Sequence, residues 1–370
     1  MGNHNIVIIG AGVVGLAIFS ELAKRYRNVY ILEKNANIAS ETSSRNSGVI
    51  HSGIHYKPGS LKANLCVQGN NLLYEICKTG RVNCQKSGKI TVARGNFEIN
   101  KIKQLYQNGL RNGVKGMRLI ESEELGKYIP ALEGDLGLFT PSTGVIEPKE
   151  LADFFYSEGL NNGGTFIPNT YAKEAKYENG KYKIKGISGG REFEISSEIV
   201  VNAAGLYAHE IAKSLGLDID RLNYRVRYFK GDYFRIEGKI PFNTLIYPAP
   251  QKYGLGIHLT TDVYGVSRLG PNSYEIDSID YKINSNAQEF IESVSRYYPP
   301  IKNYRISEDF AGIRPKIILP NGEGGDFIIR EEGQNGYPGF INLIGIDSPG
   351  LTSSPAIGKY VADLIGSFEK

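Results

Sequence analysis

The chain has five histidines, and two of them, His51 and His55, lie four residues apart in the stretch SRNSGVIHSGIHYKPGSLKANLC. Histidines at this spacing bind a metal when a single helix presents both side chains on one face. Gly48 and Gly53 interrupt such a helix, and no Asp, Glu or Cys stands close by to complete a coordination shell. The sequence therefore predicts a loop that carries two imidazoles, rather than a metal site.

A glycine-rich turn precedes this loop, between a predicted strand and a predicted helix. Residues 5–9 (NIVII) form the apolar run of a buried strand, and residues 16–26 carry apolar side chains at helical spacing. Between them, Gly10, Gly12 and Gly15 have the GxGxxG spacing of a dinucleotide-binding turn. Gly10 permits the tight turn, Gly12 lets the backbone approach a pyrophosphate, and Gly15 lets the helix pack against the strand.

An acidic residue completes this motif. The next predicted strand, NVYILEK, ends at Glu33 and Lys34, and the Glu33 carboxylate can accept hydrogen bonds from a ribose diol. The helix N-terminus offers N–H groups and a partial positive charge to the phosphates. The pattern predicts a dinucleotide site, and by itself it leaves open whether the ligand is FAD or NAD(P).

The next segment, LEKNANIASETSSRNSGVIHSG, resembles the FAD-binding segment of the D-amino-acid-oxidase superfamily, which includes glycine oxidase, sarcosine oxidase and the flavin-linked glycerol-3-phosphate dehydrogenases. The resemblance implies FAD as the cofactor, with a Ser/Thr-rich stretch that contacts its phosphates and ring. It also implies adenine contacts from one strand, a crossing segment (NAAG) beneath the cofactor, and a helix N-terminus that stabilises negative charge on the reduced flavin. The cofactor-binding residues implied in this way, in chain order, are Thr42, Ser43, Ser44, Arg45, Asn46, Ser47, Ala172, Ala204, Gly205, Pro349, Gly350, Leu351 and Thr352.

A narrower resemblance concerns the substrate. NSGVIHSGIHYKPGSLKANLCVQG, FKGDYFRI, residues 246–272, FAGIRPKI and SPGLTSSPAIG are similar, in this order, to segments of the L-2-hydroxyglutarate dehydrogenases or oxidases. The resemblance implies oxidation of a small 2-hydroxy acid, L-2-hydroxyglutarate to 2-oxoglutarate, by hydride transfer to flavin N5. Three alternatives stay open: an sn-glycerol-3-phosphate dehydrogenase, an amino-acid oxidase such as a glycine or proline enzyme, and an electron-transfer or assembly subunit without a substrate of its own.

Oxidation of a 2-hydroxy acid requires a fixed carboxylate, a C2 hydrogen that faces the flavin, and a base for the hydroxyl proton. By resemblance, Arg314 in AGIRP matches the arginine that holds the substrate carboxylate, a task that suits its planar fork. His258 in GLGIHLTTD is the first candidate for the base, and His51 and His55 compete for this role. Whether a histidine of this region attaches the flavin covalently stays open. The candidates for binding a second carboxylate are Lys57, Tyr56, Lys230, Thr260 and Thr261.

The order of predicted elements gives an α/β (α+β) fold, with a Rossmann-like FAD-binding domain and a mainly antiparallel-sheet substrate domain of the glutathione-reductase/D-amino-acid-oxidase type. The tail is expected to form a strand over residues 340–346, a loop over 348–355 and then a helix. The expected domains are residues 1–75, 150–215 and 326–370 for FAD, and residues 76–149 and 216–325 for the substrate.

Length and composition limit the number of domains, the class of partner and the role of the cysteines. A chain of 370 residues exceeds the usual size of a single core, so two domains are expected. The 43 basic and 39 acidic side chains give a net charge of +4 without a basic block, which does not favour a nucleic-acid partner and is compatible with a small anionic substrate. Three cysteines without a CxxC motif predict neither a disulfide framework nor a zinc site.

These features favour a reducing cytoplasm as the location. No signal peptide is visible, and no apolar run reaches the ~18 residues of a membrane span. Peripheral contact with the inner face of a membrane stays open. So do the oligomeric state and the electron acceptor, for which oxygen, a quinone and an acceptor protein are the alternatives.

Overall fold

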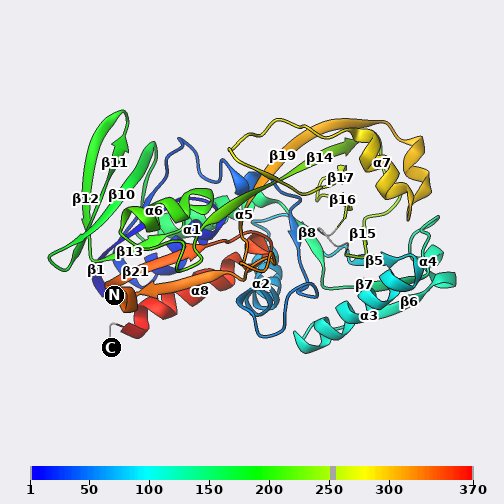
Figure 1. Ribbon diagram of the computed structural model, residues 1–370, viewed down its shortest axis with the longest axis horizontal. Coiled ribbons are helices and arrows are strands. Elements are labelled where there is room, and N and C mark those ends of the chain that lie inside the picture. The colour runs from blue at the N-terminus through cyan, green and yellow to red at the C-terminus, as the bar shows by residue number, and fades with distance from the viewer. Residues whose placement is uncertain (1, 251–255, 369–370) are drawn as a thin grey trace. The chain divides into compact units, whose positions relative to one another are not determined.

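The computed structural model describes residues 2–250 and 256–368. The chain divides into two compact units, each assembled from separate stretches of sequence (Figure 1). Unit 1 comprises residues 1–44, 148–228 and 314–370, and unit 2 comprises residues 45–147 and 229–313.

The unit boundaries differ from the expected ones mainly after the first domain segment. The structure groups residues 45–75 with unit 2, because Ile54 and Val67 pack in a hydrophobic cluster with Leu138. In addition, Nδ2 of Asn70 donates a hydrogen bond of 2.8 Å to the carbonyl of Ser142. The later boundaries lie at 147/148, 228/229 and 313/314, instead of the expected 149/150, 215/216 and 325/326.

Unit 1 is built on a six-stranded sheet in the order β20-β21-β13-β1-β2-β9, in which β20 is antiparallel and the other strands are parallel. A three-stranded antiparallel sheet, β10-β11-β12, belongs to the same unit. The strands are β1 (Gly2–Ile9), β2 (Tyr26–Leu32), β9 (Thr165–Ile167), β10 (Thr170–Glu178), β11 (Lys181–Ser188), β12 (Arg191–Ser197), β13 (Ile199–Asn202), β20 (Ile328–Glu332) and β21 (Tyr337–Ile344).

The two faces of this parallel sheet are covered differently. Helix α1 (Val13–Ala23) is buried on nearly all sides, because it packs against both α5 (Pro148–Asn161) and α8 (Gly350–Phe368). On the other face, alternate residues such as Val7 and Val200 join a core with α6 (Ala208–Ser214) and β10. Short 3-10 turns stand at η1 (Thr42–Ser44), η2 (Gly205–Tyr207) and η4 (Gly333–Asn335).

Unit 2 is built on a nine-stranded, mainly antiparallel sheet in the order β18-β14-β17-β16-β15-β5-β7-β6, with β19 paired to β14. A small sheet, β3-β8-β4, leads into the His51 loop. The strands are β3 (Val49–Ile50), β4 (Cys84–Gln85), β5 (Lys89–Ala93), β6 (Arg118–Glu121), β7 (Leu136–Thr140), β8 (Gly144–Ile146), β14 (Val226–Ile236), β15 (Leu245–Pro248), β16 (Leu259–Thr261), β17 (Ser267–Leu269), β18 (Tyr274–Ile276) and β19 (Ile306–Ile317). The helical elements are α2 (Leu61–Cys77), α3 (Gly95–Arg111), α4 (Ser122–Tyr128), α7 (Ala287–Ser295) and η3 (Pro299–Asn303).

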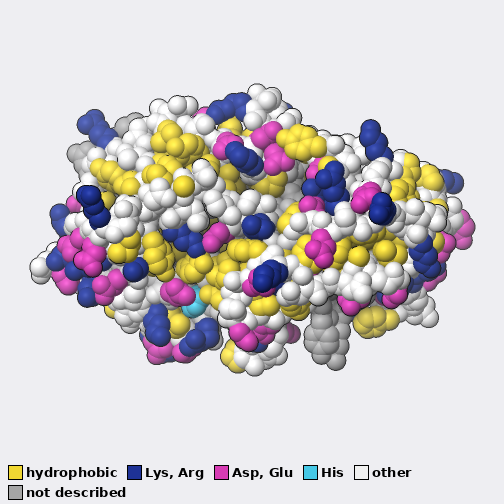
Figure 2. Space-filling model, turned by 90° about the horizontal axis from the view of Figure 1, so that it is seen from above, with side chains coloured by type: hydrophobic (Ala, Val, Ile, Leu, Met, Phe, Trp, Pro, Cys, Tyr) yellow, Lys and Arg dark blue, Asp and Glu magenta, His cyan; other side chains and the backbone are white. Residues whose placement is uncertain are grey.

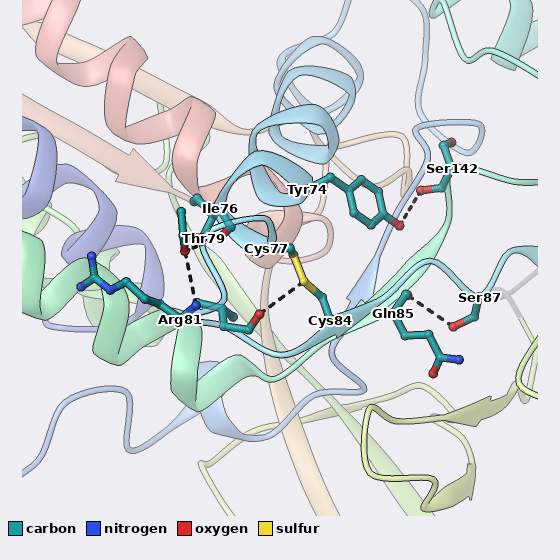
Figure 3. Close-up of a disulfide and its surroundings, with 10 residues drawn as sticks. Tyr74, Ile76, Cys77, Thr79, Arg81, Cys84, Gln85, Ser87 and Ser142 are labelled. Carbon is teal, nitrogen blue, oxygen red and sulfur yellow. Dashed lines mark hydrogen bonds between the residues drawn. A yellow bond between two sulfur atoms is a disulfide. The ribbon is translucent and has the colours of Figure 1, made fainter.

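The cysteine prediction was wrong, because the structure contains a disulfide between Cys77 and Cys84 (Figure 3). Cys77 ends α2 and Cys84 begins β4, so the turn between them brings their Cα atoms to 6.1 Å, a distance that a disulfide spans. Figure 3 also shows Tyr74 of the same helix, whose hydroxyl donates to the carbonyl of Ser142 at 3.1 Å. Cys66 is a free, buried thiol.

The last helix begins earlier than expected. Helix α8 starts at Gly350 and contains Pro355, whereas the sequence predicted a loop up to Pro355. Pro355 lies past the first turn, so it removes the backbone hydrogen bond to the carbonyl of Leu351, and that carbonyl accepts a hydrogen bond of 2.9 Å from Oγ of Ser354. Among the described residues, no helix is long and apolar enough to cross a membrane. On the face in Figure 2, basic and acidic side chains are interspersed.

Candidate active site

The glycine turn of unit 1 stands between the end of β1 and the start of α1. Gly10 has a φ of +101°, which favours glycine. A Cβ atom on Gly15 would lie 2.0 Å from the carbonyl oxygen of Gly10, so only glycine lets the helix approach the turn this closely. A Cβ atom on Gly12 would lie 3.1 Å from Oγ of Ser43, so a larger side chain does not fit at the helix start.

Glu33 is held rigidly beside this turn. The residue follows β2 directly and is 7% exposed. Its Oε2 accepts a hydrogen bond of 2.9 Å from the amide of Ala11, and its Oε1 accepts one of 2.9 Å from the amide of Asn35. Oε1 also accepts a hydrogen bond of 2.8 Å from Nδ2 of Asn35, whereas Oε2 can accept a further one, so the fixed acid is suited to a ribose hydroxyl.

A pocket of unit 1 opens at this turn. Of the expected cofactor residues, those that line it are Gly10, Gly12, Glu33, Lys34, Thr42, Ser43, Ala172, Ala204 and Gly205. The first turn of α1 carries no acidic side chain that would repel a phosphate. The glycine turn, the fixed Glu33 and the helix start therefore fit the adenosine diphosphate part of a dinucleotide.

Sequence reasoning missed several residues of this pocket. Tyr207 lines it and stacks under Lys34, whose Nζ lies 3.7 Å from the ring centroid and 2.7 Å from a carboxylate oxygen of Glu41. Tyr171 and Lys173 flank the expected Ala172 in the lining. The positions that flank a recognised residue were the available signal.

The other expected cofactor residues lie outside this pocket. Ser44 ends unit 1 before the first boundary, and Arg45, Asn46 and Ser47 belong to unit 2. There the guanidinium of Arg45 lies 4.3 Å from the ring centroid of Tyr281. Pro349 directly precedes α8 in unit 1 and residues 350–352 form its first turn, at the expected helix N-terminus.

In unit 2, one face of the nine-stranded sheet collects polar side chains. Ile90, Val92, Ile246 and Leu259 point to the other face and form a hydrophobic core with α7. Alternation then directs Lys89 of β5 and Tyr247 of β15 to the opposite face. His258 directly precedes β16 and falls on this polar face, because Ile246 pairs with Leu259. Residues 251–255, part of the expected segment 246–272, lie outside the described residues.

The His51 loop is tied to two helices of unit 2. Nδ2 of Asn70 on α2 donates a hydrogen bond of 3.0 Å to the carbonyl of His51, and Nδ2 of Asn112 donates one of 2.9 Å to the carbonyl of Gly53. A Cβ atom on Gly53 would lie 2.8 Å from Val67, so the loop packs tightly on α2. The segment is not helical, and the described residues contain no cluster of potential metal ligands.

The three histidines expected as proton acceptors meet in unit 2 around Lys89. Nζ of Lys89 lies 3.1 Å from Nε2 of His55 and 4.6 Å from the ring centroid of Tyr247. The rings of Tyr247 and His258 are stacked at 3.4 Å between centroids and 9° between planes. His51 and His258 are both close enough to His55 to influence its charge. Sequence reasoning did not select Lys89 or Tyr247.

Burial and the lysine charge keep His51 and His55 neutral. Desolvation, and then the charge of Lys89, lower the pKa of His51 to about 3. The same two causes lower the pKa of His55 well below its usual value. Desolvation also lowers the pKa of Lys89 itself, from 10.5 to about 7. Neutral imidazoles can accept a proton, although such low pKa values make His51 and His55 weak bases on their own.

The expected substrate-binding residues have different surroundings. Arg314 is half-buried in β19 and belongs to unit 1. Lys230 is fully buried, but its Nζ lies 3.2 Å from a carboxylate oxygen of Asp280, so its charge already has a partner. Lys57 is exposed in the loop after the histidines. Thr260 and Thr261 are buried in β16, where Thr261 shares a hydrogen bond of 2.8 Å with Ser267.

Comparisons with known proteins agree with this geometry. The model of the DAO family, described as FAD dependent oxidoreductase, matches residues 5–364. The mitochondrial L-2-hydroxyglutarate dehydrogenase of Arabidopsis thaliana is 36% identical over 398 residues, which cover 96% of this chain and 82% of that protein. The glycerol 3-phosphate dehydrogenase of Caloramator mitchellensis is 31% identical over 375 residues, which cover 99% of this chain and 74% of that protein.

A solved structure extends this agreement to the fold. Dithionite-reduced L-alpha-glycerophosphate oxidase from Mycoplasma pneumoniae with FAD bound superposes with a TM-score of 0.84 and 25% identity, over 99% of this chain and 95% of that one. FAD is therefore the cofactor, and the D-amino-acid-oxidase type of fold is confirmed. The family model covers nearly the whole chain, so this chain belongs to the FAD-dependent oxidoreductases of the DAO family.

Proposed function

We propose that this enzyme oxidises L-2-hydroxyglutarate to 2-oxoglutarate. The observation that supports this substrate is the 36% identity over 96% of the chain to a protein named L-2-hydroxyglutarate dehydrogenase. The human protein of this name is 32% identical over 98% of the chain. Identity at this level over the full length supports the same reaction class, and the cluster of neutral histidines supports the chemistry of an alcohol group.

The reaction removes a hydride from C2 and a proton from the hydroxyl oxygen bonded to C2. FAD supplies the acceptor for the C2 hydrogen, which leaves as a hydride with two electrons. One of His51, His55 and His258 takes the hydroxyl proton, and the carbonyl double bond forms as the proton and the hydride leave. Arg314 holds the C1 carboxylate through its planar fork, which orients C2 before the transfer.

A second candidate function is oxidation of sn-glycerol-3-phosphate. It is favoured by the 31% identity to the Caloramator mitchellensis enzyme over 99% of this chain. In that case Arg314 would bind a phosphate, and the histidines would keep the role of proton acceptor.

Anaerobic bleaching of the visible flavin absorbance distinguishes these candidates. The holoenzyme is mixed separately with L-2-hydroxyglutarate, D-2-hydroxyglutarate, sn-glycerol-3-phosphate, L-lactate, L-proline and glycine. We expect rapid bleaching with L-2-hydroxyglutarate and none with its D enantiomer. Bleaching by sn-glycerol-3-phosphate alone would replace the substrate while leaving the cofactor and fold unchanged. No bleaching by any compound would overturn the proposed reaction.

The cytoplasmic location stays a prediction, and so does contact with a membrane surface. The Arabidopsis thaliana relative is named as mitochondrial, a compartment that differs from the one predicted for this chain. Fractionation of the source cells into soluble and membrane pools, followed by immunodetection, tests both predictions.

A further inference from the structure

Lys89 is a buried cation of unit 2. Its side chain is 0% exposed, and it begins β5 in the interior of unit 2. Among the described residues, no Asp or Glu lies within ion-pair distance of Nζ, whereas the other fully buried lysine, Lys230, has Asp280 as its partner. Burial of an ammonium group without a carboxylate partner is strongly disfavoured, so a lysine in such a place is a candidate for a functional role in proton transfer.

The titratable groups around Lys89 come from each element packed on it. The loop after β3 contributes His51 and His55, α2 contributes Cys66, and β15 contributes Tyr247, with His258 beyond it. Burial raises the pKa of the Cys66 thiol and of the Tyr247 hydroxyl, so both stay uncharged. None of these groups neutralises the lysine.

His55 is the hydrogen-bond partner of Lys89. The contact of 3.1 Å joins Nζ to Nε2, and the proton between them belongs to either atom, depending on the tautomer of His55. A charged lysine donates to Nε2, which places the ring proton on Nδ1. A neutral lysine accepts from Nε2–H, which leaves Nδ1 as an acceptor.

We propose that Lys89 is a positioning residue that holds the proton removed from the substrate hydroxyl, which it receives through His55. This inference rests on the proposed function only in that an alcohol is oxidised. The O–H bond breaks and its proton goes to a histidine of the cluster, while the C2 hydrogen leaves as a hydride to FAD. Nε2 of His55 then passes a proton to Nζ, and the neutral amine of Lys89 becomes an ammonium. Reoxidation of the enzyme is accompanied by release of this proton to water.

The proton affinities in the cluster favour this direction of transfer. The pKa of Lys89, about 7, lies above that of His51, about 3, and above the lowered pKa of His55. A proton that enters at a histidine therefore comes to rest on the lysine. The histidine is neutral again at the end of the step, and its charge does not oppose the departure of the hydride.

The first test needs no substrate. In holoenzyme labelled with ¹⁵N-histidine, the ring of His55 should change from the Nδ1–H tautomer to the Nε2–H tautomer as the pH rises through about 7, where Lys89 loses its proton. Assignment is simple because the chain has only five histidines and a His55→Asn variant removes one signal. A His55 tautomer that is constant across this range would overturn the proposal.

The second test measures the pH profile of flavin reduction. In the wild type, the rate of anaerobic reduction should rise with a midpoint near 7. Lys89→Met removes the amine and Lys89→Arg keeps a permanent charge, so both variants should lose this pH-dependent step. At higher pH, their rate of flavin reduction should be lower than that of the wild type by about tenfold or more. Lys149→Met, the same change at an exposed lysine, is the control and should keep the profile.

The outcomes separate the two proposals. If Lys89→Met or Lys89→Arg keeps the midpoint near 7, Lys89 has only a packing role and the inference fails. If L-2-hydroxyglutarate does not reduce the flavin but the tautomer of His55 switches, the proposed substrate fails and the Lys89–His55 pair stands. The profile is then measured with whichever alcohol of the panel bleaches the flavin.

Discussion

Replacing Lys89 by methionine should stabilise the protein at acidic and neutral pH, although it removes a hydrogen bond. In the folded protein, burial lowers the pKa of Lys89 from 10.5 to about 7. The unfolded chain binds the lysine proton up to its ordinary pKa of 10.5, so it binds more protons than the folded state between these two values. The free energy of unfolding of the wild type therefore rises with pH across this window, and the penalty is complete below it.

The magnitude follows from the size of the fall in pKa. Each pKa unit corresponds to about 1.4 kcal/mol, so a fall from 10.5 to about 7 disfavours the folded state by about 5 kcal/mol at low pH. At about pH 9 roughly 2 kcal/mol of this penalty remains, which leaves a gain of about 3 kcal/mol between about pH 6 and about pH 9. The methionine variant lacks this contribution, and the hydrogen bond that it loses is worth about 1 kcal/mol.

The assay is urea unfolding of the holoprotein with excess FAD, followed by circular dichroism at about pH 6 and about pH 9. The measured quantity is the change in unfolding free energy between the two pH values, for the wild type minus the variant, which cancels the titration of all other groups. Lys149→Met is the matched control, because that lysine is 76% exposed. If the unfolding free energies of the wild type and Lys89→Met depend equally on pH, the burial of an uncompensated charge at Lys89 is refuted.

Three further predictions concern separate parts of the chain. Arg314→Ala should keep FAD and lower kcat/KM by about 10²-fold through the loss of about 3 kcal/mol, with Arg314→Lys intermediate; steady-state kinetics that match the wild type would contradict the carboxylate role. Gly12→Ala should weaken FAD binding by about 1–3 kcal/mol in titrations of the apoprotein, because its Cβ would lie 3.1 Å from Oγ of Ser43. Replacing Cys77 and Cys84 by serine should cost about 2 kcal/mol in urea unfolding and leave flavin reduction unchanged, and dithiothreitol should have the same effect on the wild type.

The nucleotide turn could be predicted because its determinants are local. Gly10, Gly12 and Gly15 lie within six residues of one another, and the strand and helix on either side have clear hydrophobic periods. The position of Glu33 follows from the parallel pairing of β1 and β2, which brings the carboxyl ends of both strands to one edge of the sheet. Short-range pattern and a single pairing rule were enough to identify the cofactor pocket.

The unit boundaries and the disulfide depend on contacts that the local pattern does not encode. Residues 45–75 follow the cofactor motif directly in sequence, yet Ile54 and Val67 pack with residues of unit 2. Cys77 and Cys84 become partners because α2 ends where β4 starts, and helix and strand ends are the least certain part of a prediction from sequence. In both cases tertiary packing decided the outcome.

Lys89 shows most clearly why part of the site escaped the sequence. KITVA reads as an ordinary strand in which the first residue is a surface lysine, since lysines are rarely buried. Its burial results from the neighbouring strands β7 and β15, which cover both sides of β5, and from the loop that carries His55 over it. The three histidines were selected because imidazole is the usual proton acceptor. Burial is the main reason why His51 and His55 are neutral, and the group whose charge adds to this effect is a lysine whose unusual proton affinity arises only from its position in the folded sheet.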